Sequence, residues 1–251
     1  MSLKGFIAKM MDHHFPRLWM AFRVARRDKH FEPEFWFIPA LCHRRGIAID
    51  VGTNMGEYSY FMARHALQVV AFEPNPDLWP EIRRRAPTAR IEGVALSDRS
   101  GSAEFRYVES NTGIATIEGH NALSMIGDRS SIRTREVALR TLDSFMFEGV
   151  SFLKIDVEGH EEAVLRGAEE TLRRCRPSLL IESEDRHNAG APNRLFSWLK
   201  EAGYNGYALL GSGLKSVTAP PAVTDRYVNN FIFLPVERDD LRQELFRLAS
   251  H

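Results

Sequence analysis

The sequence predicts a doubly wound α/β fold, in which helices cover both faces of a largely parallel sheet. Short apolar runs bounded by glycine or proline recur along the chain and alternate with segments of helical composition. The stretch from Gly46 to Glu73 holds two such runs around a glycine loop and a short helix, which is the βαβ arrangement of a nucleotide site. A length of 251 residues and an apolar content of 44% fit one such domain. We assign it to residues 46–251, after a helical extension over residues 1–45.

The N-terminal extension is basic and amphipathic. Apolar residues recur at helical spacing before and after Pro16, and Phe31–Leu41 leads into the sheet as the expected lid of the nucleotide site. Residues 1–30 contain seven lysines and arginines against two aspartates, although the whole chain has no net charge. Charges interrupt every apolar run, so the segment is not a signal peptide. Residues 1–28 either contact an anionic membrane surface or pack on the domain or on a second subunit, and the sequence leaves these alternatives open.

The first βαβ unit follows from three consecutive patterns. Ile47–Val51 is short, apolar and β-branched, which is typical of a strand buried on both faces. Glu57–Ala66 has helical composition. Val69–Phe72 is the next buried strand, and it ends at Glu73. That acid is placed to accept hydrogen bonds from ribose hydroxyls.

The loop of this unit reads Asp50-x-Gly52-x-Asn54-x-Gly56. Its glycines let the backbone approach a ligand, and the helix that follows offers unpaired N–H groups. It lacks the G-x-G-x-x-G spacing of a dinucleotide site, and Asp50 at the strand end would repel a pyrophosphate. An acid there suits a ligand with a cationic amino-acid head and no phosphate. S-adenosylmethionine is such a ligand.

The remaining elements follow the same alternation. Asn75 is a suitable N-cap for a helix over Pro76–Arg85. The other expected strands are Ala89–Leu96, Ala103–Val108, Arg135–Thr141, Phe152–Val157, Pro177–Ile181, Tyr204–Leu209 and Asn230–Leu234, and the other expected helices are Glu161–Arg174 and Pro192–Ala202. Residues 109–133 are irregular, and we expect a loop that either covers the substrate or is simply solvated.

A second group of chemically active residues follows two of these strands. Asp156, Glu158 and His160 end one strand, and Glu182 ends the next. Ligands of open α/β sheets bind beyond the carboxyl ends of the strands. Charges at the buried end of a strand reduce stability unless they are paired or used in function. We therefore expect these side chains at the ligand site.

Composition restricts the partners and the compartment. Zero net charge gives no global field for a nucleic acid, and we expect no such partner. Cys42 and Cys175 are far apart and fit neither a disulfide framework nor a metal knuckle, which favours a reducing, cytoplasmic location, with membrane-peripheral attachment as the alternative. No apolar run is long enough to span a membrane.

Several motifs together resemble the FkbM-type methyltransferases. They are AIDVGTNMGEYS, VVAFEPNP, GVALSD, TLDSF, LKIDVEGHEEAVLRGA and PSLLIE, in that order, and the resemblance spans about residues 31–234. It implies a Rossmann-like class I enzyme with a seven-stranded sheet whose last strand is antiparallel. It also implies S-adenosylmethionine-dependent methylation of a hydroxyl oxygen on a sugar, a glycan or a secondary metabolite.

The resemblance also assigns the cofactor-binding residues by position. The methionine part would be held by Asp50, Gly52, Asn54 and Gly56, with Thr53 (where the family often has alanine) and Tyr58 beside them; the ribose by Glu73 and Asn75; and the adenine by Val94, Ala95 and Ser97. Asp156 would face the transferred methyl group and the donor's amino group.

Methyl transfer to oxygen needs a base for the acceptor hydroxyl. His160, at a helix N-terminus, is the first candidate because that position favours the neutral imidazole. Glu158 and Glu182 are rival bases. Together with Asp156 they form an alternative in which oxygen ligands hold a divalent cation.

Two other functions remain open from the sequence alone. One is an NAD-dependent oxidoreductase, which the loop spacing disfavours, and the other is a non-catalytic nucleotide-binding accessory module. We expect the partner to be a small-molecule or glycan acceptor, and a homo-oligomer is an alternative role for the N-terminal helices.

Overall fold

The computed structural model describes residues 3–26, 31–42, 46–108, 111–119, 131–210, 213–221 and 228–250. Its α-helices are α1 (Leu3–His14), α2 (Pro16–Ala25), α3 (Ile38–Leu41), α4 (Glu57–Met62), α5 (Trp79–Arg85), α6 (Glu161–Arg166), α7 (Glu169–Cys175), α8 (Ala191–Glu201) and α9 (Asp239–Ala249). Its strands are β1 (Ile47–Val51), β2 (Gln68–Phe72), β3 (Arg90–Glu92), β4 (Ala95–Leu96), β5 (Gly101–Val108), β6 (Asn111–Thr116), β7 (Ile132–Arg140), β8 (Val150–Ile155), β9 (Ser178–Glu182), β10 (Tyr204–Leu210), β11 (Gly213–Val217) and β12 (Asn230–Pro235). Short 3-10 turns are η1 (Pro33–Phe37), η2 (Pro76–Leu78) and η4 (Asp143–Phe145).

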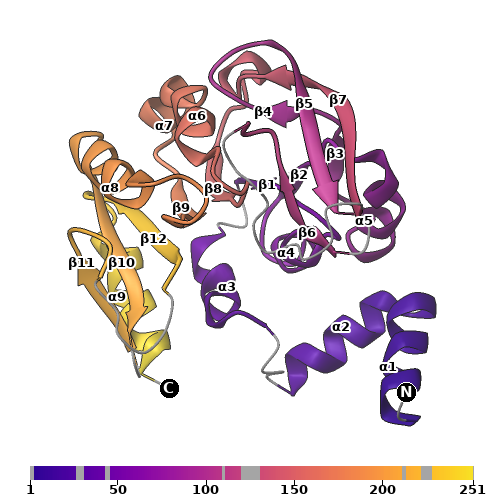
Figure 1. Cartoon of the computed structure of the whole chain (residues 1–251). Helices are drawn as coiled ribbons and strands as arrows, with labels where there is room; N and C mark the ends of the chain where they lie inside the picture. The colour runs from indigo at the N-terminus through magenta and orange to yellow at the C-terminus, as the bar shows by residue number, and fades with distance from the viewer. Residues whose placement is uncertain are drawn as a thin grey trace.

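The main sheet has the predicted doubly wound form (Figure 1). Within the described residues its order is β11-β10-β12-β9-β8-β1-β2-β3, and the five strands from β9 to β3 run parallel. The last strand, β12, lies antiparallel between β9 and β10, as expected. The predicted number of seven strands is wrong by one, because β11 adds an eighth strand at the β10 edge.

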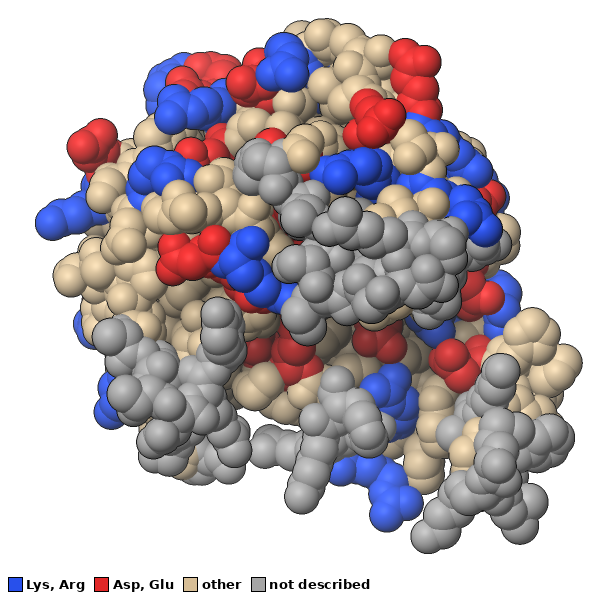
Figure 2. Space-filling model, in the orientation of Figure 1, with Lys and Arg blue, Asp and Glu red and all other residues tan. Residues whose placement is uncertain are grey.

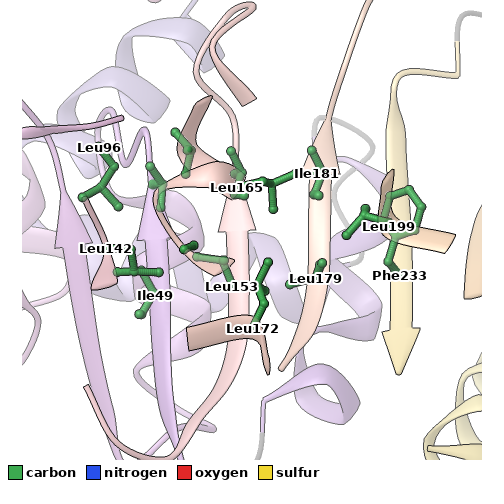
Figure 3. Close-up of a cluster of buried hydrophobic side chains, with 14 of the residues drawn as sticks. Ile49, Leu96, Leu142, Leu153, Leu165, Leu172, Leu179, Ile181, Leu199 and Phe233 are labelled. Carbon is green, nitrogen blue, oxygen red and sulfur yellow. The ribbon is translucent and has the colours of Figure 1, made fainter. Parts of the chain in front are cut away.

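Two apolar clusters fill the two faces of this sheet. On one face α6, α7 and α8 cover side chains such as Ile49, Leu153 and Phe233 (Figure 3). On the other face α3, α4, α9 and η1 cover Ala48 and Phe152, which alternate with Ile49 and Leu153 along their strands. Burial of both faces explains why the strands are continuous apolar runs.

The predicted strand Ala89–Leu96 is divided between two sheets. A Cβ atom at Gly93 would lie 2.4 Å from the indole ring of Trp79, so the chain passes that ring only at a glycine. Beyond it, β4 leaves the main sheet and joins a second, four-stranded sheet of order β4-β7-β5-β6 among the described residues. Long-range packing of this kind leaves no local signal in the sequence.

The expected loop over residues 109–133 is also corrected. It contains β6 and the start of β7, which pair with β5 in the second sheet. Residues 109–110 and 120–130 of that loop lie outside the described residues. The described residues of this segment therefore belong to strands of the second sheet, which can line one side of a cavity.

The predicted helix Glu161–Arg174 is two helices, α6 and α7. They separate at Gly167, where a Cβ atom would lie 2.0 Å from the carbonyl oxygen of Ser97. The close approach packs the end of α6 against the segment after β4.

The N-terminal helices α1 and α2 lie at the edge of the molecule (lower right in Figure 1). Phe31, Phe35 and Phe37 are buried in the core cluster beside α4, so Phe31–Leu41 packs as part of the domain. Its expected role as a lid, and the domain boundary at residue 45, stay predictions.

The distribution of charged side chains on the surface agrees with the zero net charge of the chain. Acidic and basic side chains are interspersed over the upper part of the face in Figure 2. Cys42 and Cys175 are both free thiols. In the part of the chain that the structure describes, no helix combines the length and apolarity needed to cross a bilayer.

Candidate functional site

An open cavity of about 760 Å³ lies at the carboxyl ends of the parallel strands β1, β2 and β8. Its opposite wall comes from the second sheet, chiefly Phe105 and Tyr107 of β5 and Thr116 of β6. Sequence reasoning missed this wall, although Phe105 and Tyr107 alternate at the period of a strand with one buried face.

The structure brings most of the predicted site residues to this cavity. Those lining it are Gly52, Asn54, Glu73, Asn75, Val94, Ala95, Asp156, Glu158 and His160. The predicted residues outside its lining are Asp50, Thr53, Gly56, Tyr58, Ser97 and Glu182. The second group lies behind or beside the cavity, and its contacts show what each residue does there.

The glycine loop forms a cradle at the edge of the cavity, and a side chain at either glycine would crowd neighbouring residues of the protein itself. Gly52 has φ +77°, and a Cβ atom there would lie 1.8 Å from the carbonyl oxygen of Asp156. Gly56 has φ +85° and precedes α4 as its N-cap. Asn54 takes the left-handed conformation as well, and its Oδ1 is buried without a hydrogen-bond partner among the described residues. A buried acceptor that borders a cavity is a position for a ligand donor.

Glu73 connects this loop to the segment after β2. Its Oε2 accepts a hydrogen bond from the backbone N–H of Asn54, and its Oε1 accepts one from that of Asn75, both at 2.8 Å. Burial raises the pKa of Glu73 to about 7, against the opposing effect of these two hydrogen bonds. The carboxylate lines the cavity and keeps further lone pairs for hydroxyl donors.

Asp50 lies behind the loop, with its side chain fully buried. Its Oδ2 accepts a 2.7 Å hydrogen bond from Ser59, and its Oδ1 has no partner among the described residues. Burial raises its pKa, although the charge of Lys154 acts in the opposite direction. Asp50 does not line the cavity, so the structure does not show the expected contact between Asp50 and the cationic head of a ligand. Thr53 lies beside it and donates to the Asp50 carbonyl oxygen.

Both ring nitrogens of His160 have partners. Nδ1 lies 2.5 Å from Oε1 of Glu118, and Nε2 lies 3.0 Å from Oγ of Ser97. These contacts join the start of α6 to the segments after β4 and β6. His160 therefore links two walls of the cavity, with Glu118 on one ring nitrogen and Ser97 on the other. Ser97 is fully buried and does not line the cavity, whereas its neighbour Leu96 does.

Glu158 lines the cavity, and its carboxylate contacts a histidine. Its Oε2 lies 2.7 Å from Nε2 of His187. Its φ of +54° is an uncommon backbone conformation for glutamate, and Thr116 donates to its carbonyl oxygen. Strain of this kind clusters at functional sites. Burial lowers the pKa of His187, but the hydrogen bond and charge of Glu158 outweigh burial and raise it above its ordinary value of 6.5.

The other two acids have separate partners. Asp156 accepts a 2.9 Å hydrogen bond from Lys154, whose ammonium lies 4.6 Å from the ring centre of Tyr58. Glu182 accepts a 2.6 Å hydrogen bond from Asn229, and burial, followed by the charge of Asp156, raises its pKa to about 10. Within the described ranges no three acidic, histidine or cysteine side chains cluster as metal ligands do. The predicted cation set is thus not assembled by these residues.

A family model described as the methyltransferase FkbM domain matches residues 50–205, which include the glycine loop, Glu73 and the strand ends of the cavity. The chain belongs to the FkbM methyltransferase family. The predicted family resemblance is confirmed.

Proteins of known description that resemble this chain include two bacterial or archaeal enzymes. The AMB antimetabolite synthetase AmbE of Pseudomonas aeruginosa is 27% identical over 199 residues, which are 63% of this chain and 9% of that protein. The hexuronic acid methyltransferase AglP of Haloferax volcanii is 30% identical over 131 residues, which are 49% of this chain and 50% of that protein. This FkbM family member therefore spans half or less of the length of these relatives.

Solved structures with a related shape include two methyltransferases. A methyltransferase FkbM from Methylobacillus flagellatus has a TM-score of 0.49 at 15% identity and aligns over 75% of this chain and 43% of that one. An O-methyltransferase from Bacillus cereus, in complex with SAH, has a TM-score of 0.46 at 15% identity over 90% of this chain and 95% of that one.

Proposed function

We propose that this FkbM family member is an S-adenosylmethionine-dependent O-methyltransferase that acts on a hydroxyl of a sugar, a glycan or a secondary metabolite. One observation carries the proposal: a single cavity is lined by the Gly52 cradle, by Glu73 and by Glu158. The first two fit a nucleoside with an amino-acid tail, and the third is a base beside it. A relative whose name describes a hexuronic acid methyltransferase supports the choice of a sugar-like acceptor.

The residues present fit this cofactor. Gly52 lets the loop pack against the Asp156 backbone at the edge of the cavity. The unpartnered Asn54 Oδ1 can accept from an ammonium group, and Glu73 can accept from two ribose hydroxyls. Val94 and Ala95 supply an apolar edge for the adenine. When bound, S-adenosylmethionine supplies an electrophilic methyl group on a sulfonium. The chain's own residues then need to align the acceptor and take its proton.

The Glu158–His187 pair is the proton acceptor in this proposal. The hydroxyl proton passes to a carboxylate oxygen of Glu158, and a neutral His187 takes a proton from Oε2 across the 2.7 Å contact. The hydrogen bond and the charge of Glu158 raise the pKa of His187 above its ordinary value, so the neutral imidazole of the pair is a stronger base. The other candidates rank behind Glu158 in this proposal. His160 has Glu118 and Ser97 on its two ring nitrogens. Asp156 is paired with Lys154, and Glu182 lies outside the cavity lining.

The direct test of the proposed function is methyl transfer itself. The purified chain is incubated with methyl-labelled S-adenosylmethionine and a panel of hydroxylated acceptors that includes uronic acids, neutral sugars and phenols. We expect labelled product and stoichiometric S-adenosylhomocysteine with at least one hydroxyl acceptor. Cofactor binding without transfer to any acceptor, including amines and thiols, would favour a non-catalytic module, and transfer to an amine alone would contradict O-methylation.

We predict that turnover does not require a divalent cation. Each acid of the proposed metal set has its own cationic or amide partner, so no open set of oxygen ligands is formed by the described residues. The measurement is turnover after treatment with EDTA, followed by addition of Mg²⁺ or Mn²⁺. We expect a change of less than about twofold. Loss of turnover that Mg²⁺ restores would show that the carboxylates rearrange around a cation.

A further inference from the structure

The outer face of α2 is an exposed apolar surface. Phe15, Leu18 and Phe22, with 56%, 62% and 46% of their surface exposed, follow one another at positions i, i+3 and i+7. This spacing places them on one side of the helix. The half-buried indole of Trp19 stacks on Phe22, with ring centres 5.6 Å apart. We name Phe15, Leu18, Trp19 and Phe22 the α2 apolar face.

The opposite side of the N-terminal helices is firmly anchored. Met20 is fully buried in the core cluster beside α4. Arg85, itself buried, bonds the carboxylate of Asp12 at 2.9 Å and 3.1 Å. Arg23 pairs with Glu57 at 3.2 Å, and Tyr60 donates to the carbonyl oxygen of Arg17. The anchoring holds the α2 apolar face outward.

The charge of this segment is complementary to an anionic surface. Residues 1–30 contain seven lysines and arginines and two aspartates. Asp12, one of the two, is already engaged by Arg85. Arg17 and Arg26 are exposed at the two ends of α2, and the guanidinium of Arg26 lies 5.4 Å from the ring centre of Phe22. A second copy docked face to face through the same surface would bring like charges together, which disfavours that occupant.

We propose that the α2 apolar face docks the protein on an anionic lipid membrane. Aromatic and leucine side chains would enter the boundary between headgroups and acyl chains, and Arg17 and Arg26 would pair with anionic headgroups. Phe15, Leu18 and Phe22 are exposed to solvent on a helix that lies at the edge of the molecule (Figure 1). The inference is independent of the proposed chemistry, because none of these residues lines the cavity.

Vesicle flotation of the full chain tests the docking. The probes are vesicles of phosphatidylcholine with about one third phosphatidylglycerol, and vesicles of phosphatidylcholine alone. We expect flotation with the anionic vesicles that weakens at high salt. The double variant Leu18→Ser, Phe22→Ser should lose at least about tenfold in partitioning. The variant Arg17→Gln, Arg26→Gln should lose about fivefold for each arginine.

Matched controls separate docking from general stickiness. Leu67→Ser removes a leucine that is 73% exposed elsewhere on the surface, and it should float like the wild type. Circular dichroism and thermal melts confirm that each variant is folded, and sedimentation velocity gives the mass. Equal flotation of wild type and the Leu18→Ser, Phe22→Ser variant would overturn the proposal. The proposal would also be overturned if the wild type did not float and the Leu18→Ser, Phe22→Ser variant had a lower mass than the wild type in solution. That result would assign the face to a second copy.

Discussion

Replacing Glu158 by glutamine should lower turnover by about 10²- to 10⁴-fold while leaving cofactor affinity nearly unchanged. Glutamine keeps the size of the side chain but cannot accept the acceptor's proton. The same variant removes the negative charge that lies 2.7 Å from His187. Single-turnover kinetics at saturating S-adenosylmethionine measure the chemical step directly, and calorimetry measures the affinity.

The pH profile gives this prediction a second readout. The pair accepts a proton only when His187 is neutral, so the rate should rise with pH through a value above the ordinary histidine pKa of 6.5, because Glu158 raises the pKa of His187. His187→Gln should remove that limb. Glu170→Gln, an exposed glutamate paired with Arg173, is the matched control and should change neither quantity. Full activity of Glu158→Gln with loss of activity in His160→Gln would return the role of base to His160.

Replacing Glu73 by alanine should weaken S-adenosylmethionine binding by about ten- to a hundredfold. Hydrogen bonds to a charged acceptor contribute about 1.5–3 kcal/mol, and each 1.4 kcal/mol is about tenfold in affinity. Part of the loss would come from the loop, since the Glu73 carboxylate also accepts from the N–H groups of Asn54 and Asn75. Titration calorimetry gives the dissociation constant, and a thermal melt shows whether the variant is folded.

The pH dependence of binding gives a second readout of the Glu73 assignment. Burial raises the pKa of Glu73 to about 7, so the carboxyl is largely protonated below that pH and ionised above it. Ribose hydroxyls donate to the ionised form, so affinity should be highest above about pH 8 and fall as the pH is lowered through about 7. Glu73→Gln should lose this dependence. An unchanged dissociation constant in folded Glu73→Ala would remove the ribose assignment.

The βαβ unit could be predicted because its signals are local. A β-branched run, two glycines with positive φ and an acid at the end of the second strand lie within Gly46–Glu73, and the N-cap at Asn75 follows directly. These features depend on backbone sterics and hydrogen bonds between near neighbours. The second sheet could not be predicted in the same way, since β4 reaches it only because Gly93 passes Trp79.

The contacts of the candidate site join residues that are far apart in the sequence, so no local sequence pattern predicts them. The position of Glu158 at a strand end makes it a candidate, but its partner His187 is 29 positions further on. The place of His160 at a helix start predicts a base, and its contacts with Ser97 and Glu118 come from two other segments. The loop pattern predicts that Asp50 touches the ligand, yet Asp50 is buried behind the loop with Ser59.

Titration calorimetry of the wild-type chain with S-adenosylmethionine, S-adenosylhomocysteine and NAD tests the central claim most directly. The central claim is that the cavity between the Gly52 loop and β5 holds S-adenosylmethionine. We predict saturable one-to-one binding of both adenosyl ligands and no binding of NAD. Binding of NAD without either adenosyl ligand would contradict the claim and assign the cavity to a dinucleotide.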